Sequence, residues 1–406
     1  MSKRIRLMIP LLVALFLLAT AAANAESTSR KIVVFRAGVD AAAQRGAIQG
    51  VGGNSIKSLR LVNATVANLA PAAAAALARR AGVVRVEDDA LAHAIAPAAP
   101  ATAVPDVKPD RANGGKPKPT PTPAPQVTPW GITRINAPEA WTSLTGERVT
   151  GAGVKVAVID TGISTSHPDL VVAGGVNEVN PAKSFNDDNG HGSHVAGIIA
   201  AKDNSLGVVG VAPDASLYAV KVLDRNGSGW VSDIIAGLDW SVANGMQVAN
   251  MSLGTSSDVT SFHEAIISAY AAGLTIVAAA GNSGPASNSV EYPAKYSEVL
   301  AISAIDSSNS IASWSSNGPE VDLAAPGVSI YSTYKGSGYT TLSGTSMAAP
   351  HVTGTVALRL QIDTDKSPSH IASILKDNAT WIQKPNLSSG QQGAGMVDAY
   401  KVVTAN

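Results

Sequence analysis

The apolar positions of this chain gather into short runs that alternate with longer helical stretches. Residues 154–159 are almost continuously apolar, which is typical of a strand covered on both faces. We expect further strands of this kind at residues 216–222, 248–251, 274–280 and 299–302.

Helical patterns fill the intervals between these runs, at residues 191–201, 231–244, 261–272 and 346–362. Strands that alternate with helices at this spacing predict an α/β domain built on a mostly parallel sheet.

A smaller unit is expected ahead of this domain, in residues 26–95. Its pattern predicts strands at residues 31–35, 59–62 and 83–86, with a helix at residues 72–80. Residues 96–125 are rich in proline, alanine and threonine, a composition that cannot bury a core and predicts an extended linker. The larger domain would then span residues 126–406.

The first residues have the pattern of a targeting segment. Lys3 and Arg4 precede an apolar stretch at residues 7–22, and the small-x-small pattern Ala-Asn-Ala ends at Ala25. This predicts a signal peptide of residues 1–25, and therefore a secreted, extracellular protein. A transmembrane anchor is the alternative, but the apolar stretch is short for a span and ends in the cleavage pattern.

Composition excludes several classes of function. The 406 residues have a formal net charge of zero, so nothing favours nucleic acid or an anionic membrane surface as a partner. The absence of cysteine rules out disulfides, thiol nucleophiles and zinc–thiolate sites.

Polar residues occur where ligands bind to α/β sheets, at the carboxyl ends of strands. Asp160 ends the run at residues 154–159, and Asn282 follows the run at residues 274–280. His191 and Ser346 each open a helical stretch among small residues. Taken singly, each has a structural explanation, such as an Asx turn, a loop asparagine or a helix N-cap.

Four segments together resemble the subtilisin-like serine proteases: Val-Ile-Asp-Thr-Gly-Ile, His-Gly-Ser-His-Val-Ala-Gly, Ala-Ala-Ala-Gly-Asn and Gly-Thr-Ser-Met-Ala-Ala-Pro-His-Val. They occur in the family's order of Asp, His and Ser, which differs from that of chymotrypsin-like enzymes and α/β-hydrolases. The resemblance implies a three-layer α/β/α fold with a mostly parallel central sheet, preceded by a small α+β propeptide domain.

The resemblance also implies a role for each polar residue. Ser346 would attack the scissile carbonyl, His191 would transfer the proton, and Asp160 would orient the imidazole. Asn282 and the Ser346 N–H would stabilise the oxyanion. His194 could pair with His191 on a metal, but no glutamate lies between them, so a structural role is favoured.

Substrate-binding segments follow from the same resemblance. Two edges, residues 227–229 and 252–254, would bracket an extended peptide, and Glu291 would lie at the base of the S1 pocket, where its carboxylate could favour Lys or Arg. A solvated Glu291 that points away is the alternative. The implied substrate-binding residues are Gly227, Ser228, Gly229, Ser252, Leu253, Gly254, Ala279, Ala280, Gly281 and Glu291.

The smaller unit resembles the family's inhibitory propeptide, whose end implies self-cleavage near Ile95–Ala96. This bond has no basic residue, which argues against strict Lys or Arg specificity. The family's catalytic domain usually begins almost at once, whereas here the linker intervenes. We therefore expect a mature N-terminus between about Ala96 and Gln126.

One structural Ca²⁺ site is implied by the resemblance, because oxygen donors match the family's ligands throughout. A second, weaker cation site would use carbonyls of Ala294, Tyr296 and Val299. The implied ligands of the strong site are Gln126, Asp169 and Asn204, with the carbonyls of Lys202, Leu206 and Val208.

The sequence thus predicts a secreted, monomeric serine endopeptidase that cleaves extended polypeptides through an acyl-enzyme. It would be made as a self-processing precursor, inhibited by its own propeptide and free of the membrane after processing. A non-catalytic binding protein on the same fold and an ester hydrolase are the rival classes. The complete set of catalytic residues counts against the first, and the peptide-bracketing segments and the propeptide count against the second.

Overall fold

The computed structural model of the chain describes residues 27–95, 125–142, 146, 148–385 and 387–405. The predicted signal peptide and nearly all of the predicted linker lie outside the described residues. The described chain forms two compact units. The smaller unit contains the residues up to Ser58 and Asn63–Asp88, and the larger unit contains Leu59–Val62 and Asp89–Asn406.

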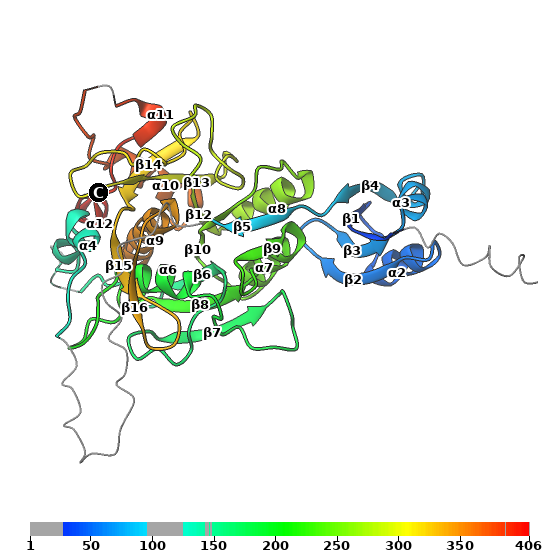
Figure 1. Cartoon of the computed structure of the whole chain (residues 1–406), viewed down its shortest axis with the longest axis horizontal. Coiled ribbons are helices and arrows are strands. Elements are labelled where there is room, and N and C mark those ends of the chain that lie inside the picture. Colours follow the sequence, from blue (N-terminus) through cyan, green and yellow to red (C-terminus); the bar gives the residue numbers. More distant parts are fainter. Residues whose placement is uncertain (1–26, 96–124, 143–145, 147, 386, 406) are drawn as a thin grey trace, which may run out of the picture. The chain divides into compact units, whose positions relative to one another are not determined.

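The smaller unit is a four-stranded sheet with two helices. Its strand order is β2-β3-β1-β4, and β1 runs antiparallel to both β3 and β4. Ile48 and Leu77 of the two helices pack with Phe35 and Leu69 of the strands in one apolar cluster. The elements, coloured blue to cyan in Figure 1, are β1 (Ser29–Phe35), α2 (Ala41–Gln49), β2 (Asn54–Leu59), β3 (Ala64–Leu69), α3 (Pro71–Ala78) and β4 (Val83–Asp88).

The strand predicted at residues 59–62 is wrong, because β2 ends at Leu59 and the chain turns there. The backbone N–H groups of Arg60 and Leu61 donate to the two carboxylate oxygens of Asp239, each at 2.7 Å, and not to a neighbouring strand. Asn63 has a φ of 46°, which a strand does not contain.

The larger unit is built on a seven-stranded sheet of order β14-β13-β12-β10-β6-β8-β7, in which all neighbouring pairs are parallel. The prediction of a mostly parallel sheet is confirmed. The strands are β6 (Lys155–Asp160), β7 (Val172–Asn177), β8 (Ser216–Lys221), β10 (Val248–Met251), β12 (Thr275–Ala279), β13 (Val299–Ile305) and β14 (Val321–Pro326).

Helices cover both faces of this sheet, which gives the expected three layers. Figure 1 shows α6 and α9 on one side of the central strands and α7 and α8 on the other, and the members of each pair pack together. The helices are α6 (His191–Ala200), α7 (Val231–Ala243), α8 (Thr260–Ala271), α9 (Thr345–Ile362) and α10 (Pro368–Asp377). Within the described ranges, no helix is both long and apolar enough to cross a membrane.

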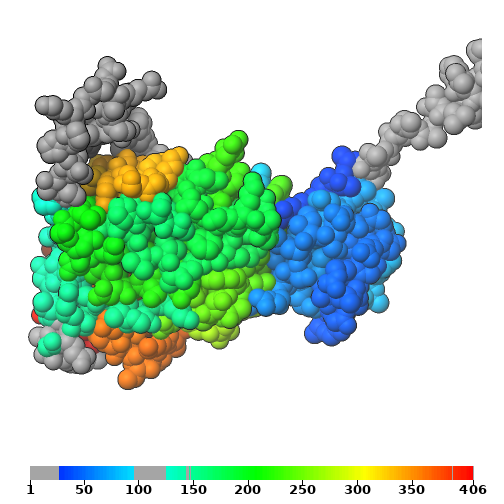
Figure 2. All heavy atoms as spheres, turned by 90° about the horizontal axis from the view of Figure 1, so that it is seen from below, coloured from blue at the N-terminus to red at the C-terminus, as the bar shows by residue number. Residues whose placement is uncertain are grey.

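Shorter elements complete the larger unit. A three-stranded sheet of order β11-β5-β9 contains β5 (Leu91–Ala94), β9 (Ser228–Trp230) and β11 (Leu253–Gly254). A hairpin joins β15 (Ile330–Thr333) to β16 (Tyr339–Leu342). Figure 2 shows the face on which the green segments, including edge strand β7, form most of this unit's surface. The short helices are α4 (Trp130–Arg134), α5 (Ala137–Ala140), α11 (Ser389–Gln392) and α12 (Ala399–Thr404).

Candidate active site

The four polar residues singled out in the sequence meet at the carboxyl edge of the parallel sheet. Asp160 is the last residue of β6, and Asn282 follows the end of β12. His191 is the first residue of α6, and Ser346 is the second residue of α9. The side chains of Asp160 and Ser346 are fully buried, and His191 is 5% exposed.

The imidazole of His191 is held by the carboxylate of Asp160. His191 Nδ1 lies 2.8 Å from Oδ1 and 2.9 Å from Oδ2, so this nitrogen carries the hydrogen and donates. Burial alone would lower the pKa of His191, but the charge and hydrogen bond of Asp160, with the charge of Asp187, raise it above the usual 6.5. The proton is therefore held more tightly than in a free histidine.

A glycine lets α6 begin close to Asp160. A Cβ placed on Gly192 would lie 2.1 Å from the carbonyl oxygen of Gly162 and 3.2 Å from Asp160 Oδ1. Any larger residue would push the first turn of the helix away from the turn that follows β6. The His-Gly pair in the sequence therefore reflects a requirement of packing.

The hydroxyl of Ser346 faces a backbone carbonyl. Ser346 Oγ donates to the carbonyl oxygen of Ile95 at 3.0 Å and to that of Ser252 at 3.2 Å. His191 Nε2 is buried and has no hydrogen-bond partner. In this structure, the serine is therefore directed at the end of the β5 segment and not at the imidazole.

Strand β5 lies between the two segments that were predicted from the sequence to bracket a peptide. Ala92 is paired with Gly229 on one side, and Ala94 with Leu253 on the other, both in antiparallel register. The Ala94 N–H also donates to the carbonyl oxygen of Gly227 at 2.8 Å. Main-chain hydrogen bonds thus hold residues 91–95 as an added strand.

Glu291 lines a cavity of about 730 Å³ next to Ile95. A Cβ on Gly254 would lie 2.4 Å from Glu291 Oε2, and one on Gly281 would lie 3.1 Å from Oε1, so both glycines leave room for the carboxylate. Glu291 Oε1 accepts the hydroxyl of Ser283 at 3.1 Å. Burial raises the pKa of Glu291, although the Ser283 hydrogen bond counteracts this.

The side-chain amide of Asn282 is fixed by Thr345. Its Oδ1 accepts the backbone N–H and the hydroxyl of Thr345, both at 3.0 Å, so its Nδ2 points elsewhere. A Cβ on Gly344 would lie 3.2 Å from Asn282 Nδ2 and 3.9 Å from the carbonyl oxygen of Ile95. The amide donor and this carbonyl oxygen thus both lie beside Gly344.

Comparisons with known proteins agree with this geometry. A model described as the subtilase family matches residues 151–395. The chain belongs to the subtilase family. Subtilisin Savinase of Lederbergia lenta is 50% identical over 274 residues, which cover 68% of this chain and 98% of that protein. An alkaline protease of Alkalihalobacillus alcalophilus is also 50% identical over 274 residues, 68% of this chain and 69% of that protein.

A longer match extends over most of the chain. Subtilisin amylosacchariticus of Bacillus subtilis subsp. amylosacchariticus is 41% identical over 371 residues, 89% of this chain and 88% of that protein. The protein is therefore a serine endopeptidase that acts on polypeptides, and the predicted family, fold class and enzyme class are confirmed.

The residues expected to bind calcium in this subtilase also lie together. Gln126 Nε2 donates to the carbonyls of Lys202 and Val208 at 2.6 and 3.2 Å. Asn204 Nδ2 donates to Asp169 Oδ1 at 2.8 Å. Rotating both amides would exchange their nitrogens for their oxygens and complete an all-oxygen set of ligands, which Ca²⁺ prefers. The residues therefore fit the ion.

His194, the second histidine of the family motif, has structural partners. Its Nε2 lies 3.1 Å from the carbonyl oxygens of Ile330 and Thr340, so this nitrogen donates. Burial lowers the pKa of His194 to about 3, which keeps the ring neutral.

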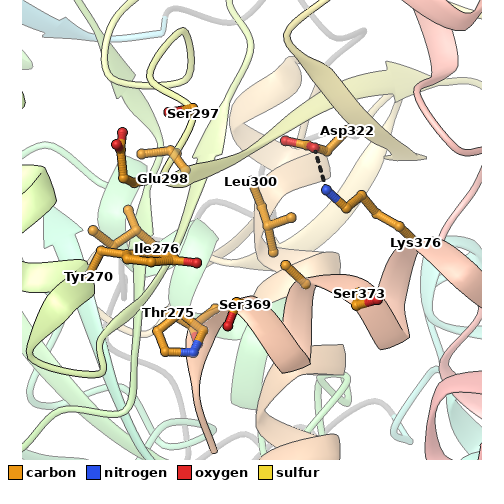
Figure 3. Close-up of a pocket in the computed structure, with 13 residues that line it drawn as sticks. Tyr270, Thr275, Ile276, Ser297, Glu298, Leu300, Asp322, Ser369, Ser373 and Lys376 are labelled. Atoms are coloured by element: carbon orange, nitrogen blue, oxygen red, sulfur yellow. Dashed lines mark hydrogen bonds and ion pairs between the residues drawn. The ribbon is translucent and has the colours of Figure 1, made fainter.

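A second cavity in the larger unit lies at the amino edge of the parallel sheet, whereas the candidate active site of this subtilase lies at the carboxyl edge. The cavity has a volume of about 250 Å³ and is lined by Thr275 and Val299, the first residues of β12 and β13. Asp160 is, in contrast, the last residue of β6. Figure 3 shows that Asp322 and Lys376 face each other there, with their charged atoms 3.3 Å apart. The residues of the candidate active site do not line this cavity.

Sequence reasoning missed Asp187, a buried carboxylate just before α6. An acidic residue ahead of a helix is a capping signal, and residues 187–190 (Asp-Asp-Asn-Gly) carry it. The sequence does not reveal which other groups reach this carboxylate.

Proposed function

We propose that this subtilase is a secreted endopeptidase that uses Ser346, His191 and Asp160, and that it is made as a precursor that cleaves itself. The signal peptide would be residues 1–25, the propeptide residues 26–95, and the peptidase domain residues 126–406 after the linker. One observation carries the proposal: the Ile95 carbonyl oxygen lies 3.0 Å from Ser346 Oγ, at the end of a segment bound as an added strand.

The first step is attack by Ser346. The hydroxyl turns from the carbonyl oxygens toward His191 Nε2, which has no other partner and accepts the proton. Oγ then bonds to the carbonyl carbon of Ile95, and the peptide bond to Ala96 breaks as His191 returns the proton to the leaving amine. Water then gives a proton to His191 and bonds to the acyl carbon, and His191 returns that proton to Ser346 Oγ as the ester bond breaks. Asp160 keeps the proton on Nδ1 throughout.

Negative charge develops on the carbonyl oxygen during attack. Asn282 Nδ2 and the N–H of Ser346 would donate to it, at the N-terminus of α9. Because Thr345 already holds the Asn282 amide, this donor needs no reorganisation. His191 must be neutral to act as the base, so activity should rise as the pH rises through a pKa above 6.5.

Substrates would bind as β5 does. Residues 227–229 and 252–254 supply main-chain hydrogen bonds on the two sides of an extended peptide. The side chain before the cleaved bond would enter the cavity that Glu291 lines with Gly254 and Asn282. Of the expected wall residues, Gly281 adjoins the Glu291 carboxylate, whereas Ala279 and Ala280 do not line this cavity. A carboxylate at this place would favour Lys and Arg, whereas the absence of a basic residue at the Ile95–Ala96 bond argues against a strict preference.

Calcium would stabilise the fold, and no catalytic step uses it. Its ligands would be the side chains of Gln126, Asp169 and Asn204, with the carbonyls of Lys202, Leu206 and Val208. As a hard cation it would supply charge that holds the loop after α6 to the start of the domain. The weaker second site at the carbonyls of Ala294, Tyr296 and Val299 remains a prediction.

Replacing the nucleophile tests the catalytic assignment. Ser346→Ala should leave the precursor uncut and abolish peptidase activity, because no other group can form the acyl-enzyme. Ser343→Ala, three residues away, should be processed and active. Gel electrophoresis and a peptide assay give the readout, and normal self-processing of the Ser346 variant would refute the proposal.

The role of Glu291 is tested by Glu291→Gln, which keeps the shape and removes the charge. The kcat/KM for peptides with Lys or Arg before the cleaved bond should fall about tenfold or more, because a hydrogen bond to a charged group contributes about 1.5–3 kcal/mol. Peptides with Leu or Ile there should be cleaved at least as well. Glu298→Gln, a carboxylate that lines the other cavity, is the control. An unchanged preference would exclude a role for Glu291.

Chelation tests the calcium site. A free Ca²⁺ concentration about 100 times the Kd stabilises a protein by about 2.7 kcal/mol, so EGTA should lower the Tm by several degrees. Asp169→Asn should remove this sensitivity, whereas Asp203→Asn, an exposed carboxylate bound to Arg148, should keep it. A Tm that does not depend on calcium would contradict the site.

A further inference from the structure

The carboxylate of Asp187 accepts five hydrogen bonds. Its Oδ1 accepts the hydroxyl of Thr161 at 3.0 Å and the N–H groups of Asn189 and Gly190 at 2.9 and 2.8 Å. Its Oδ2 accepts the N–H and the hydroxyl of Ser193 at 2.9 and 2.7 Å. The side chain of Asp187 is therefore hydrogen-bonded to the turn after β6, to the loop before α6 and to the first turn of α6.

These bonds connect the two partners of the His191–Asp160 pair. The Thr161 N–H donates to Asp160 Oδ1 at 2.6 Å, and Thr161 Oγ1 accepts the N–H of Gly192 at 2.9 Å. Thr161 is the neighbour of Asp160, and Gly192 is the neighbour of His191. A shift of Asp187 would therefore move the carboxylate and the imidazole relative to each other.

Only a carboxylate satisfies all these donors. Thr161 Oγ1 and Ser193 Oγ each already accept an N–H, from Gly192 and Ser164, so both hydroxyl hydrogens are directed at Asp187. All five partners donate, and an asparagine would turn its own NH₂ group toward some of them. Both the shape and the negative charge of the Asp187 carboxylate thus serve to satisfy these five donors.

Several titratable groups around His191 are neutral. Burial lowers the pKa of His194, on α6, to about 3 and that of His351, on α9, to about 4. Burial, with the charge of Asp187, raises the pKa of Tyr334, which follows β15. These rings carry no charge near pH 7.

The charged groups lie on β6, β8 and the loop before α6. Lys221 on β8 donates to Asp188 and to two carbonyl oxygens, so its charge is already neutralised by a partner. Asp160 and Asp187 provide the negative charge that raises the pKa of His191 against its burial. Asp187 does so without touching the imidazole.

We propose that Asp187 is a positioning residue of this subtilase: its five hydrogen bonds align His191 with Asp160, and its carboxylate is a second negative charge beside this pair. The inference rests on the proposed role of His191 as the general base. Asp187 itself contacts no reacting atom.

The test is a pair of variants that separate charge from alignment, measured on the processed enzyme. Asp187→Asn should lower kcat about tenfold to a hundredfold, because a small misplacement of a catalytic group is costly, while KM stays nearly constant. The imidazolium is less stable with less negative charge beside it, so the pKa of His191 falls and the acid limb of kcat/KM moves to lower pH. Asp187→Glu should also lower kcat but leave the acid limb in place.

A readout that does not depend on peptide binding completes the test. Inactivation by phenylmethylsulfonyl fluoride requires only the activated serine, and Asp187→Asn should slow it by the same factor as kcat. Should the Asp187 variants fail to fold, Thr161→Val removes the hydroxyl that joins Asp187 to the N–H of Gly192 and keeps the charge of Asp187. It should lower kcat with an unmoved acid limb.

Asp188→Asn is the matched control, because it removes the adjacent carboxylate, whose side chain is 55% exposed and bound to Lys221. It should retain kcat and the acid limb. Unchanged kcat and acid limb in Asp187→Asn, or an equal change in Asp188→Asn, would overturn the inference. An active Ser346→Ala enzyme would instead refute the proposed function, so the two failures are distinguishable.

Discussion

The parallel register of the seven-stranded sheet is the constraint on which the rest of the structure depends. Parallel strands end at the same edge, so residues far apart in the sequence meet there without any local interaction. Asp160 ends β6, Asn282 follows β12, and the helices that begin at this edge present His191 and Ser346. The sheet fixes where the site is, and the residues at the edge decide what it can do.

Burial strengthens electrostatic interactions at this edge of the sheet and makes an unpaired polar group there costly. Asp160 and Ser346 are fully buried, so each polar atom needs a partner and each charge acts strongly on its neighbours. The carboxylates of Asp160 and Asp187 offset the burial that would otherwise strip the proton from His191. The added strand β5 satisfies main-chain groups in the same way, because it pairs with residues 228–230 on one side and with Leu253 and Gly254 on the other.

The sequence predicts the buried strands of the fold better than its edge strands and turns. The run at residues 248–251, apolar except for Asn250, matches β10 to the residue, since a strand covered on both faces leaves a mostly apolar signature. Edge strand β7 was missed because its sequence, Val-Ala-Gly-Gly-Val-Asn, is half-buried and interrupted by glycines. The false strand at residues 59–62 was apolar enough, but Asp239 takes up its N–H groups and turns the chain.

The residues of the candidate site were likewise predicted from the sequence only in part. Asp160, His191, Asn282 and Ser346 were found because motifs mark them, and the structure brings all four to one edge. Asp187 was not found, because its importance lies in donors from Thr161 and Ser193 that only the fold assembles. The place of Glu291 likewise depended on Gly254 and Gly281, whose lack of side chains leaves the space that its carboxylate fills.

The central claim is that Ser346 is the nucleophile and that His191 activates it. Its most direct test is mass spectrometric mapping after reaction with phenylmethylsulfonyl fluoride, in the processed natural protein and in a His191→Ala precursor that the natural enzyme has cleaved in trans. We expect one sulfonyl adduct, on the peptide that contains Ser346, and its loss in the His191 variant. An adduct on another residue, or an equal rate of labelling without the imidazole, would contradict it.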